Sequence, residues 1–394
     1  MKRWAGRPAG ILIWVAAWLL TALPVPAQEP GVSDDRILFG QSAAFSGPAQ
    51  ELGISMRLGI QAAFHEVNRA GGIDGRRLEL TSLDDAYEPE AAVANTLALI
   101  REQEVFALIG AVGTPTSRAA VPVAADANVP YIAPFTGAEF LRDAEWSNVI
   151  NLRASYNQET EEMVARLTED MGIKRIAVLF QDDSFGRAGY RGVRAALDRR
   201  NMTPVAIGLY PRNTLAVKMA LLDINDGDPK AVILIGAYKP LATFISWARF
   251  SGLQAVFMNI SFVGSNALAK ELGSAGAGVY VTQVVPFPTD KSRPIVRDYH
   301  RALSAYASGV VPGFISFEGY LAGRLAIAGL KHSGREISRA GFLDGFRQAG
   351  MMDLGGFRLR FGDQDNQGSD AVYLTVIGRD GQYRPISSML EAAP

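Results

Sequence analysis

The stretch IGAVGTPTS, residues 109–117, joins an apolar, strand-like run to glycine, threonine, proline and serine, and it holds no charged residue. Threonine at the N-cap followed by proline at the first helical position is typical of a helix start, so we expect a helix to begin at Thr114 and Pro115. The unpaired N–H groups and positive dipole end of such a helix suit a carboxylate or carbonyl oxygen. This turn is therefore a candidate binding site for the polar end of a small molecule.

Two later turns have the same form, with a strand-like run followed by small polar residues and an aromatic side chain. APFTGAEF, residues 133–140, offers Phe135 and Thr136, and QDDSFGRAGY, residues 181–190, offers Phe185 with Ser184 as a predicted helix cap. Taken singly, each of these turns is equally well explained as an ordinary helix start. These turns can form a binding site only if the fold brings them together.

Motifs for catalysis, metal binding and nucleotide binding are missing from the sequence. It has no cysteine, no G-x-S-x-G, no H-E-x-x-H and no G-K-[ST]. The three histidines lie in predicted helices with polar neighbours, which indicates surface or capping roles: His65, His300 and His332. The pairs Asp84–Asp85 and Asp182–Asp183 follow strands without a third regularly spaced carboxylate, so helix capping is favoured over metal binding. We expect neither a cofactor nor a metal, and a secreted α/β hydrolase is the weakest alternative.

The first 27 residues differ from the rest of the chain. MKRWAGRP is basic, residues 9–23 are apolar, and PVPAQE places small residues where a signal peptidase would cleave after Ala27. A membrane anchor is the alternative, but it needs about 20 apolar residues. Cleavage would leave 367 residues and change the formal net charge from −1 to −4, which does not suit a nucleic-acid surface. Without cysteine the exported product has neither disulfides nor a lipid-anchoring thiol, so we expect it to be freely soluble.

After the signal sequence, short β-branched runs alternate with longer segments of helical periodicity. RILFGQ, VFALIGAV, RIAVLFQ and AVILIGA are predicted strands, and EPEAAVANTLALIREQ and QETEEMVARLTEDMG are predicted helices. The predicted strands are more numerous than one doubly wound sheet usually holds. The pattern can be divided near residues 148–155 and at the proline-rich segment 284–294. We predict an α/β fold of two lobes with parallel sheets. Such sheets bind ligands at the carboxyl ends of their strands, so the three turns would face one cleft.

The whole mature chain resembles the leucine/isoleucine/valine-binding family of type I periplasmic binding proteins. The resemblance begins with FSGPAQELGISMRLGIQAAFHEVNRAGGIDGRRLEL and continues through DDAYEPEAAVANTLALI, IGAVGTPTS, VPYIAPFTGAEF, DDSFGRAGY, IGAYKP, FMNISFVGSNAL and YLTVIGRDGQY. It implies two Rossmann-like lobes joined by three crossovers that form a hinge. By position, residues 34–150 and 286–368 would form the N-terminal lobe, and 151–285 and 369–394 the C-terminal lobe, after a signal peptide at 1–27.

The resemblance also implies ligand-binding positions, although several of them are changed in this chain. In the family, a hydroxyl group binds the α-carboxylate of the ligand, and that position matches Thr114. The position in the next turn whose carbonyl group contacts the ligand matches Phe135. Two aromatic positions of the family match Phe185 and Tyr238. The family's threonine in the second turn falls on Gly137, with Thr136 adjacent. The aromatic residue after S-G-P becomes Leu52, and the acid that pairs with the ligand's ammonium becomes Ser261.

The change at Ser261 is the most informative of these differences. A buried ammonium without a carboxylate partner is costly, so we predict a poor fit for a zwitterionic amino acid. The retained Thr114 and the added Phe135 and Phe185 favour a carboxylate- or amide-bearing solute with an apolar or aromatic body. Alternatively, Glu51 or Asp183 supplies the missing negative charge.

The expected function is therefore solute capture in the periplasm. The resemblance implies that the lobes close on a small molecule and deliver it to an ABC importer made of permease and ATPase subunits. The alternative is a ligand-sensing receptor module that docks on a signalling partner. We expect a monomer that binds no nucleic acid.

Overall fold

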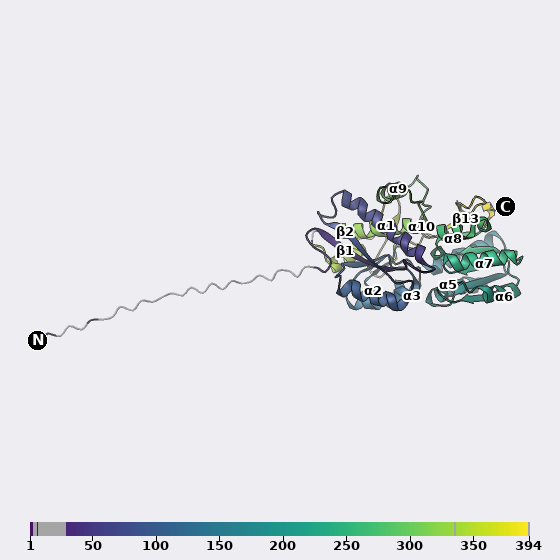
Figure 1. Ribbon diagram of the computed structural model, residues 1–394, viewed down its shortest axis with the longest axis horizontal. Coiled ribbons are helices and arrows are strands. Elements are labelled where there is room, and N and C mark those ends of the chain that lie inside the picture. Colours follow the sequence, from purple (N-terminus) through teal and green to yellow (C-terminus); the bar gives the residue numbers. More distant parts are fainter. Residues whose placement is uncertain (3–5, 7–28, 335, 393–394) are drawn as a thin grey trace.

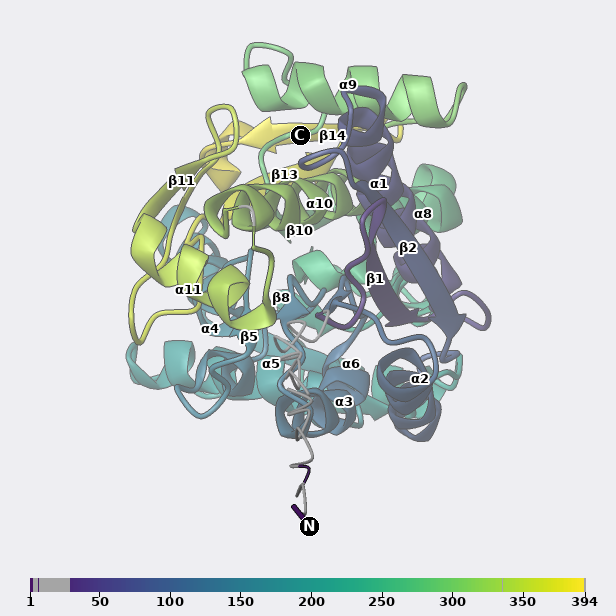
Figure 2. The same cartoon turned by 90° about the vertical axis from the view of Figure 1, so that its left-hand side faces the viewer.

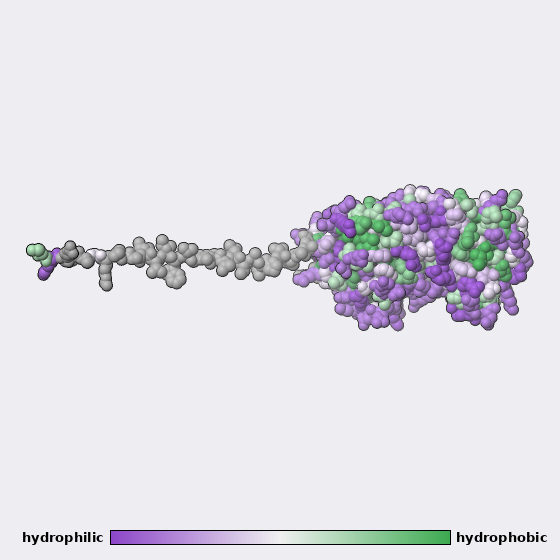
Figure 3. All heavy atoms as spheres, turned by 90° about the horizontal axis from the view of Figure 1, so that it is seen from below, coloured by the Kyte–Doolittle hydropathy of each residue, from purple (hydrophilic) through white to green (hydrophobic). Residues whose placement is uncertain are grey.

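The computed structural model of the protein has two α/β lobes that lie side by side (Figure 1). The structure describes residues 1–2, 6, 29–334 and 336–392, so the predicted cleavage after Ala27 lies outside the described residues. Within these ranges no helix is both long and apolar enough to cross a bilayer. Seen from below, hydrophilic residues cover most of the surface, and each lobe carries a smaller apolar area (Figure 3).

The first lobe is built on a five-stranded parallel sheet with the strand order β2-β1-β3-β4-β5. Its strands are β1 (Arg36–Ala43), β2 (Arg77–Asp84), β3 (Ala107–Ile109), β4 (Tyr131–Ile132) and β5 (Val149–Ile150). The helices between them are α1 (Gln50–Arg69), α2 (Pro89–Arg101), α3 (Thr114–Asp126) and η1 (Glu139–Arg142). Parallel strands connected by helices are the arrangement that the alternating sequence pattern predicts.

The second lobe is built on a seven-stranded sheet with the order β14-β13-β10-β9-β8-β6-β7. Its strands are β6 (Ile176–Gln181), β7 (Ile207–Tyr210), β8 (Ala231–Ile235), β9 (Val256–Asn259), β10 (Tyr280–Gln283), β13 (Tyr373–Ile377) and β14 (Tyr383–Ile386). Its helices are α4 (Tyr156–Ala165), η2 (Arg166–Asp170), α5 (Ser184–Asp198), α6 (Lys218–Asp226), α7 (Tyr238–Phe250), η3 (Ser261–Val263), α8 (Ser265–Leu272), η4 (Gly273–Gly276) and η5 (Met389–Ala392). Only β13 and β14 run antiparallel to their neighbours, as the last strands of the chain.

The segment between β10 and β13 returns to the first lobe. It contains α9 (Pro294–Tyr306), α10 (Phe314–His332), α11 (Arg339–Ala349), β11 (Met351–Asp353) and β12 (Arg358–Arg360). Both α9 and α10 pack against α1, and Figure 2 shows α10 and α1 side by side. The chain therefore passes between the lobes three times, which confirms the predicted two-lobed fold with a three-crossover hinge. The exact lobe boundaries, 34–150 with 286–368 and 151–285 with 369–394, stay a proposal.

Glycines allow α1 and α10 to approach each other closely. A Cβ atom added to Gly59 would lie 2.0 Å from the carbonyl oxygen of Ser316, and one added to Gly319 would lie 2.2 Å from that of Met56. Both distances are shorter than atomic contact allows, so the two helix backbones touch where side chains are missing. This contact lies near the middle of α1 and holds that helix against α10.

Substituting Gly59 with alanine should therefore destabilise the protein. We expect Gly59→Ala to lower the free energy of unfolding by about 2–3 kcal/mol, because the methyl group forces α1 and α10 apart. Chemical denaturation followed by circular dichroism would measure the loss. Gly341→Ala in α11 is the matched control, since its added Cβ meets only the Ser338 hydroxyl at 3.1 Å. Equal stability of the Gly59→Ala and wild-type proteins would contradict the close contact.

The helix starts at the cleft differ by one residue from those predicted. Gly113, with φ of 103°, precedes the first residue of α3, so Thr114 is the first helical residue and its hydroxyl does not cap the helix. Asp183 caps α5 by accepting hydrogen bonds from the N–H groups of Phe185 and Gly186 at 2.9 and 3.2 Å, so Ser184 is not the cap. In both helices the N-cap is the residue before the predicted one. The Thr114 hydroxyl is therefore not engaged in capping and can make other contacts.

Candidate functional site

Three buried hydroxyl groups form a chain where the two lobes meet. The Thr114 hydroxyl at the start of α3 lies 2.6 Å from that of Thr136, which follows β4. Thr136 in turn donates to the Tyr156 hydroxyl at 3.2 Å, from the first residue of α4. Burial raises the pKa of Tyr156 to about 12, so its phenol remains protonated near neutral pH. The structure thus brings Thr114 and Thr136 together and adds a third hydroxyl from across the hinge.

Aromatic rings pack next to this hydroxyl chain. The ring centroid of Phe262 in η3 lies 4.4 Å from that of Phe185, 5.4 Å from that of Phe135 and 6.0 Å from that of Tyr87. Phe135 and Tyr87 follow strands of the first sheet, whereas Phe185 and Phe262 follow strands of the second. These four rings, which we call the aromatic cluster, therefore close the space between the lobes with apolar surface from both sides.

A buried arginine joins the aromatic cluster to two carboxylates. The Arg153 guanidinium lies 4.9 Å from the centroid of the Phe135 ring and forms ion pairs with Glu159 at 3.3 Å and Glu318 at 3.5 Å. Glu159 comes from α4 and Glu318 from α10, and the side chains of all three residues are at most 5% exposed. Burial raises the pKa of Glu318 to about 7, although the charge of Arg153 opposes the shift.

Ser261 lies directly beside the Glu159 carboxylate. Its N–H and hydroxyl groups donate to Glu159 at 2.9 and 2.8 Å, Thr282 donates to the same carboxylate at 2.6 Å, and Ser261 also contacts Arg153. A carboxylate is thus present at this position even though residue 261 is not an acid. Because Arg153, Ser261 and Thr282 already satisfy it, Glu159 has little capacity left for a ligand's ammonium group.

A second group of contacts joins the lobes at the edge of the cleft. Arg212, which follows β7, pairs with Glu88 at 2.5 Å and with Asp183 at 3.6 Å. The side-chain amide of Asn213 donates to Glu88 at 2.7 Å and to the carbonyl oxygen of Ala86 at 3.1 Å. Asp183 is therefore engaged by Arg212 and by its helix cap, which makes it a poor substitute for the missing ligand acid.

The remaining predicted site residues lie around the same region. Gly137 has no room for a side chain, since a Cβ there would lie 2.6 Å from a ring carbon of Tyr156. This contact accounts for glycine where the family resemblance implied threonine. Leu52 is buried in α1 and faces Gly264, whose added Cβ would lie 2.7 Å from a methyl group of Leu52. Tyr238, the first residue of α7, is buried too, but its ring lines a separate groove between the lobes.

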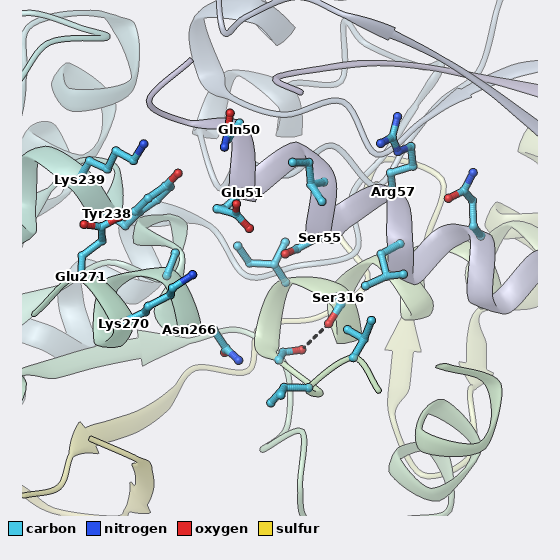
Figure 4. A pocket seen from close by; sticks show the side chains of 18 of the residues that line it. Gln50, Glu51, Ser55, Arg57, Tyr238, Lys239, Asn266, Lys270, Glu271 and Ser316 are labelled. Atoms are coloured by element: carbon cyan, nitrogen blue, oxygen red, sulfur yellow. Dashed lines mark hydrogen bonds between the residues drawn. The ribbon is translucent and has the colours of Figure 1, made fainter. Parts of the chain in front are cut away.

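That groove has a volume of about 710 Å³ and lies between α1 on one side and α7 and α8 on the other (Figure 4). In the close view, Tyr238, Lys239, Lys270 and Glu271 stand on the second-lobe wall and face Glu51 and Ser55 of α1. Glu51 therefore lies outside the aromatic cluster, on the wall of this groove. Within the described residues no group of three or more acidic or histidine side chains could hold a metal ion.

Sequence reasoning missed several residues at the centre of the site. They are Tyr87, Arg153, Tyr156, Glu159, Phe262 and Glu318. Phe262 lies next to Ser261 in the quoted turn, so its position was available from the sequence. Glu159 and Glu318 lie in helices about which the sequence shows only amphipathic periodicity, and nothing local indicates that their carboxylates meet Arg153.

Two parallel-sheet lobes that meet over buried hydroxyls and aromatic rings define a class of hinged ligand-binding proteins. A family model described as periplasmic binding protein matches residues 37–382, and the chain belongs to this family. The members are binding proteins of the periplasm and not enzymes, which confirms the predicted family, the predicted fold and the absence of an enzymatic role.

Individual relatives agree with this assignment. A solved structure of "a possible leucine/isoleucine/valine-binding protein" from Rhodopirellula baltica SH 1 superposes with a TM-score of 0.86 and 39% identity, covering 93% of this chain and 98% of that one. The leucine-, isoleucine-, valine-, threonine- and alanine-binding protein of Pseudomonas aeruginosa is 23% identical over 70% of this chain and 74% of its own. The match to Leu/Ile/Val-binding protein homolog 7 of Brucella abortus is 25% identical and spans 61% of that protein's length.

The raised pKa of Glu318 makes a testable contribution to stability. Between its usual value of 4.5 and about 7, the folded protein binds more protons at Glu318 than the unfolded chain does. This group therefore lowers the free energy of unfolding as the pH rises through that window. We expect the wild-type protein to lose about 3 kcal/mol relative to Glu318→Gln between pH 4.5 and pH 8.

Urea denaturation at several pH values would measure this difference. Glu102→Gln serves as a control, because Glu102 is exposed at the end of α2. Its stability curve should run parallel to the wild-type curve at all pH values. A parallel curve for Glu318→Gln as well would contradict the buried carboxylate's raised pKa.

Proposed function

We propose that this protein captures a small organic solute with a carboxylate or amide group and an apolar or aromatic body, and delivers it to an ABC importer. The solute would bind between the lobes at Thr114, Phe135, Thr136, Gly137, Phe185, Tyr238, Ser261 and Leu52. The observation that carries the proposal is the buried hydroxyl chain of Thr114, Thr136 and Tyr156 beside the N-terminus of α3.

The polar end of the solute would bind at this hydroxyl chain. Hydroxyl groups and helix N-terminal N–H groups donate hydrogen bonds, and both favour a carboxylate or carbonyl oxygen. Because Gly113 and not Thr114 precedes the helix, the Thr114 side chain is not used up in capping. The Thr114 and Thr136 hydroxyls lie 2.6 Å apart, which supports a ligand oxygen that would accept from both once the lobes open.

The body of the solute would replace contacts within the aromatic cluster. Phe135 and Phe185 belong to different lobes, and the ring of Phe262 packs against both of them. A flat or branched apolar group inserted here would keep the same rings buried. An α-ammonium group would instead need a free carboxylate, and Glu159 is already bound by Arg153, Ser261 and Thr282. These contacts favour a solute without a free ammonium group.

Binding would be coupled to closure of the lobes about the three-crossover hinge. The open and closed forms exchange, and a solute that contacts both lobes shifts the population toward the closed form. Closure excludes water, which strengthens the polar contacts to Thr114 and Thr136. A permease would then recognise the closed form. Export through a signal peptide cleaved after Ala27 would place the protein, as a monomer, where such an importer begins.

A ligand panel tests the class of solute. We expect calorimetry and thermal-shift measurements to find binding for aromatic carboxylates or amides, such as cinnamate, phenylacetate and benzamide, and not for leucine or valine. Mass spectrometry of material released from the purified protein would identify a solute that co-purifies. Tight binding of leucine would overturn the proposed class. Binding without uptake by vesicles that contain the permease would favour the receptor alternative.

The role of Thr114 can be tested separately. We expect Thr114→Ala to weaken binding of the identified solute by about 1–3 kcal/mol, because a buried ligand oxygen would lose its partner. Thr114→Ser keeps the hydroxyl and should bind like the wild-type protein. Calorimetry on the three proteins gives the comparison, after thermal denaturation has shown that all are folded. Unchanged affinity in Thr114→Ala would remove this residue from the site.

A further inference from the structure

The groove between α1 and the second lobe is separated from the aromatic cluster by a thin partition. At Gly264, two residues after Phe262, an added Cβ would lie 2.7 Å from Leu52, 3.5 Å from Tyr238 and 3.6 Å from Ile315. The side chains of Tyr238 and Ile315 also line the groove, whereas Leu52 is buried behind it. These side chains and the bare backbone of Gly264 therefore form part of the partition between the groove and the predicted solute site.

The walls of the groove belong to different lobes. Glu51, Ser55 and Leu58 are on α1, which packs with the first lobe, while Tyr238 and Lys270 are on helices of the second sheet. Opening of the lobes would therefore move these two walls apart and widen the groove next to the predicted solute site. Its volume of about 710 Å³ is within the range of about 300–1,000 Å³ typical of small-molecule pockets. Both lobes could therefore hold a solute that extends beyond the aromatic cluster.

The second-lobe wall of the groove carries a phenol and two ammonium groups. The Tyr238 hydroxyl has no hydrogen-bond partner within the described part of the chain, although the backbone of Glu51 lies nearby and the residue is only 1% exposed. Burial raises the pKa of Tyr238 to about 12, so the phenol is a donor near neutral pH. Lys239 and Lys270 stand on the same wall of the groove. A phenol and two ammonium groups together suit an anionic group.

The rest of the lining gives the groove both a net charge and an apolar floor. Its cations are Arg57, Lys239 and Lys270, and its carboxylates are Glu51 and Glu271. Positive charge is therefore in excess, although Glu271 adjoins Lys270. Ile54, Leu58 and Ile315 supply aliphatic surface between the charged ends. An elongated solute with an apolar middle and a negatively charged far end matches this distribution.

We propose that the solute is a dicarboxylate-like compound whose first carboxylate binds at Thr114 and whose second binds in the groove between Lys239 and Lys270, next to the Tyr238 hydroxyl. Its apolar middle crosses the partition at Gly264 and displaces Leu52 from that glycine. The inference rests on the proposed function, because it assumes that the first end of the solute binds at the hydroxyl chain. It adds that the solute is longer than a single amino acid and negatively charged at both ends.

Matched pairs of acids test the second charge. Calorimetry with the full mature chain would compare pimelate, suberate, azelate and sebacate with the monocarboxylates heptanoate, octanoate, nonanoate and decanoate. We expect at least one dicarboxylate to bind about tenfold more tightly than the monocarboxylate of the same length, since each charge-assisted hydrogen bond contributes that order of affinity. Equal affinities within every pair would overturn the inference.

Variants locate the second charge in the groove. Lys239→Ala with Lys270→Ala should remove the roughly tenfold advantage of the dicarboxylate and leave monocarboxylate binding unchanged. Lys331→Ala at the exposed end of α10 is the matched control and should change neither. Ser55→Trp, which fills the groove from α1, should weaken the dicarboxylate selectively. A dicarboxylate advantage that survives in both groove variants would place the second carboxylate elsewhere and overturn the inference.

The two proposals fail in different ways. If monocarboxylates bind and Thr114→Ala weakens them, but the second carboxylate adds nothing, the proposed function stands and the groove inference falls. If no mono- or dicarboxylate binds, the proposed solute class is wrong, and this inference falls with it.

Discussion

The Arg153 guanidinium is fully buried, and a charge in that position is stable only when carboxylates surround it. Glu159 on α4 and Glu318 on α10 supply them, so the ion cluster ties together the crossover after β5 and helices from both lobes. Removing either carboxylate would leave a buried charge without a full complement of partners. The relative positions of α4, α10 and the turn at Ser261 are therefore set by one electrostatic requirement.

That requirement shapes the proposed solute site as well. Arg153 lies over the ring of Phe135, and Glu159 accepts hydrogen bonds from Ser261, so the arginine and its carboxylates border the aromatic cluster. In this chain, the acid that could have held an ammonium group is a partner of the protein's own arginine. The surfaces that meet between the lobes therefore include hydroxyl donors and aromatic rings. An anionic or neutral polar head with an apolar body meets those surfaces without leaving a charge unpaired.

Much of the fold was predictable from local pattern. Runs such as AVILIGA are buried on both sides in the structure, because β8 is covered on both faces, and uninterrupted apolar strands predict that environment. The turns at residues 109–117 and 133–140 also converge as predicted, since the carboxyl ends of neighbouring parallel strands lie at one edge of a sheet. The N-caps lie one residue before the predicted positions because Gly113 and Asp183 suit an N-cap as well as Thr114 and Ser184 do.

The sequence by itself determined the alternation of strands and helices, the family, and the hydroxyl and aromatic residues of the three turns. Only the tertiary structure decided that Glu159 and Glu318 enclose Arg153, that Tyr156 fills the space beside Gly137, and that the Tyr238 hydroxyl has no hydrogen-bond partner among the described residues. The physical reason is the sequence separation over which each interaction acts. Periodicity and turn chemistry act over a few neighbouring residues, whereas the Arg153–Glu318 pair joins residues that are far apart in the chain and meet only when both lobes are folded and packed together.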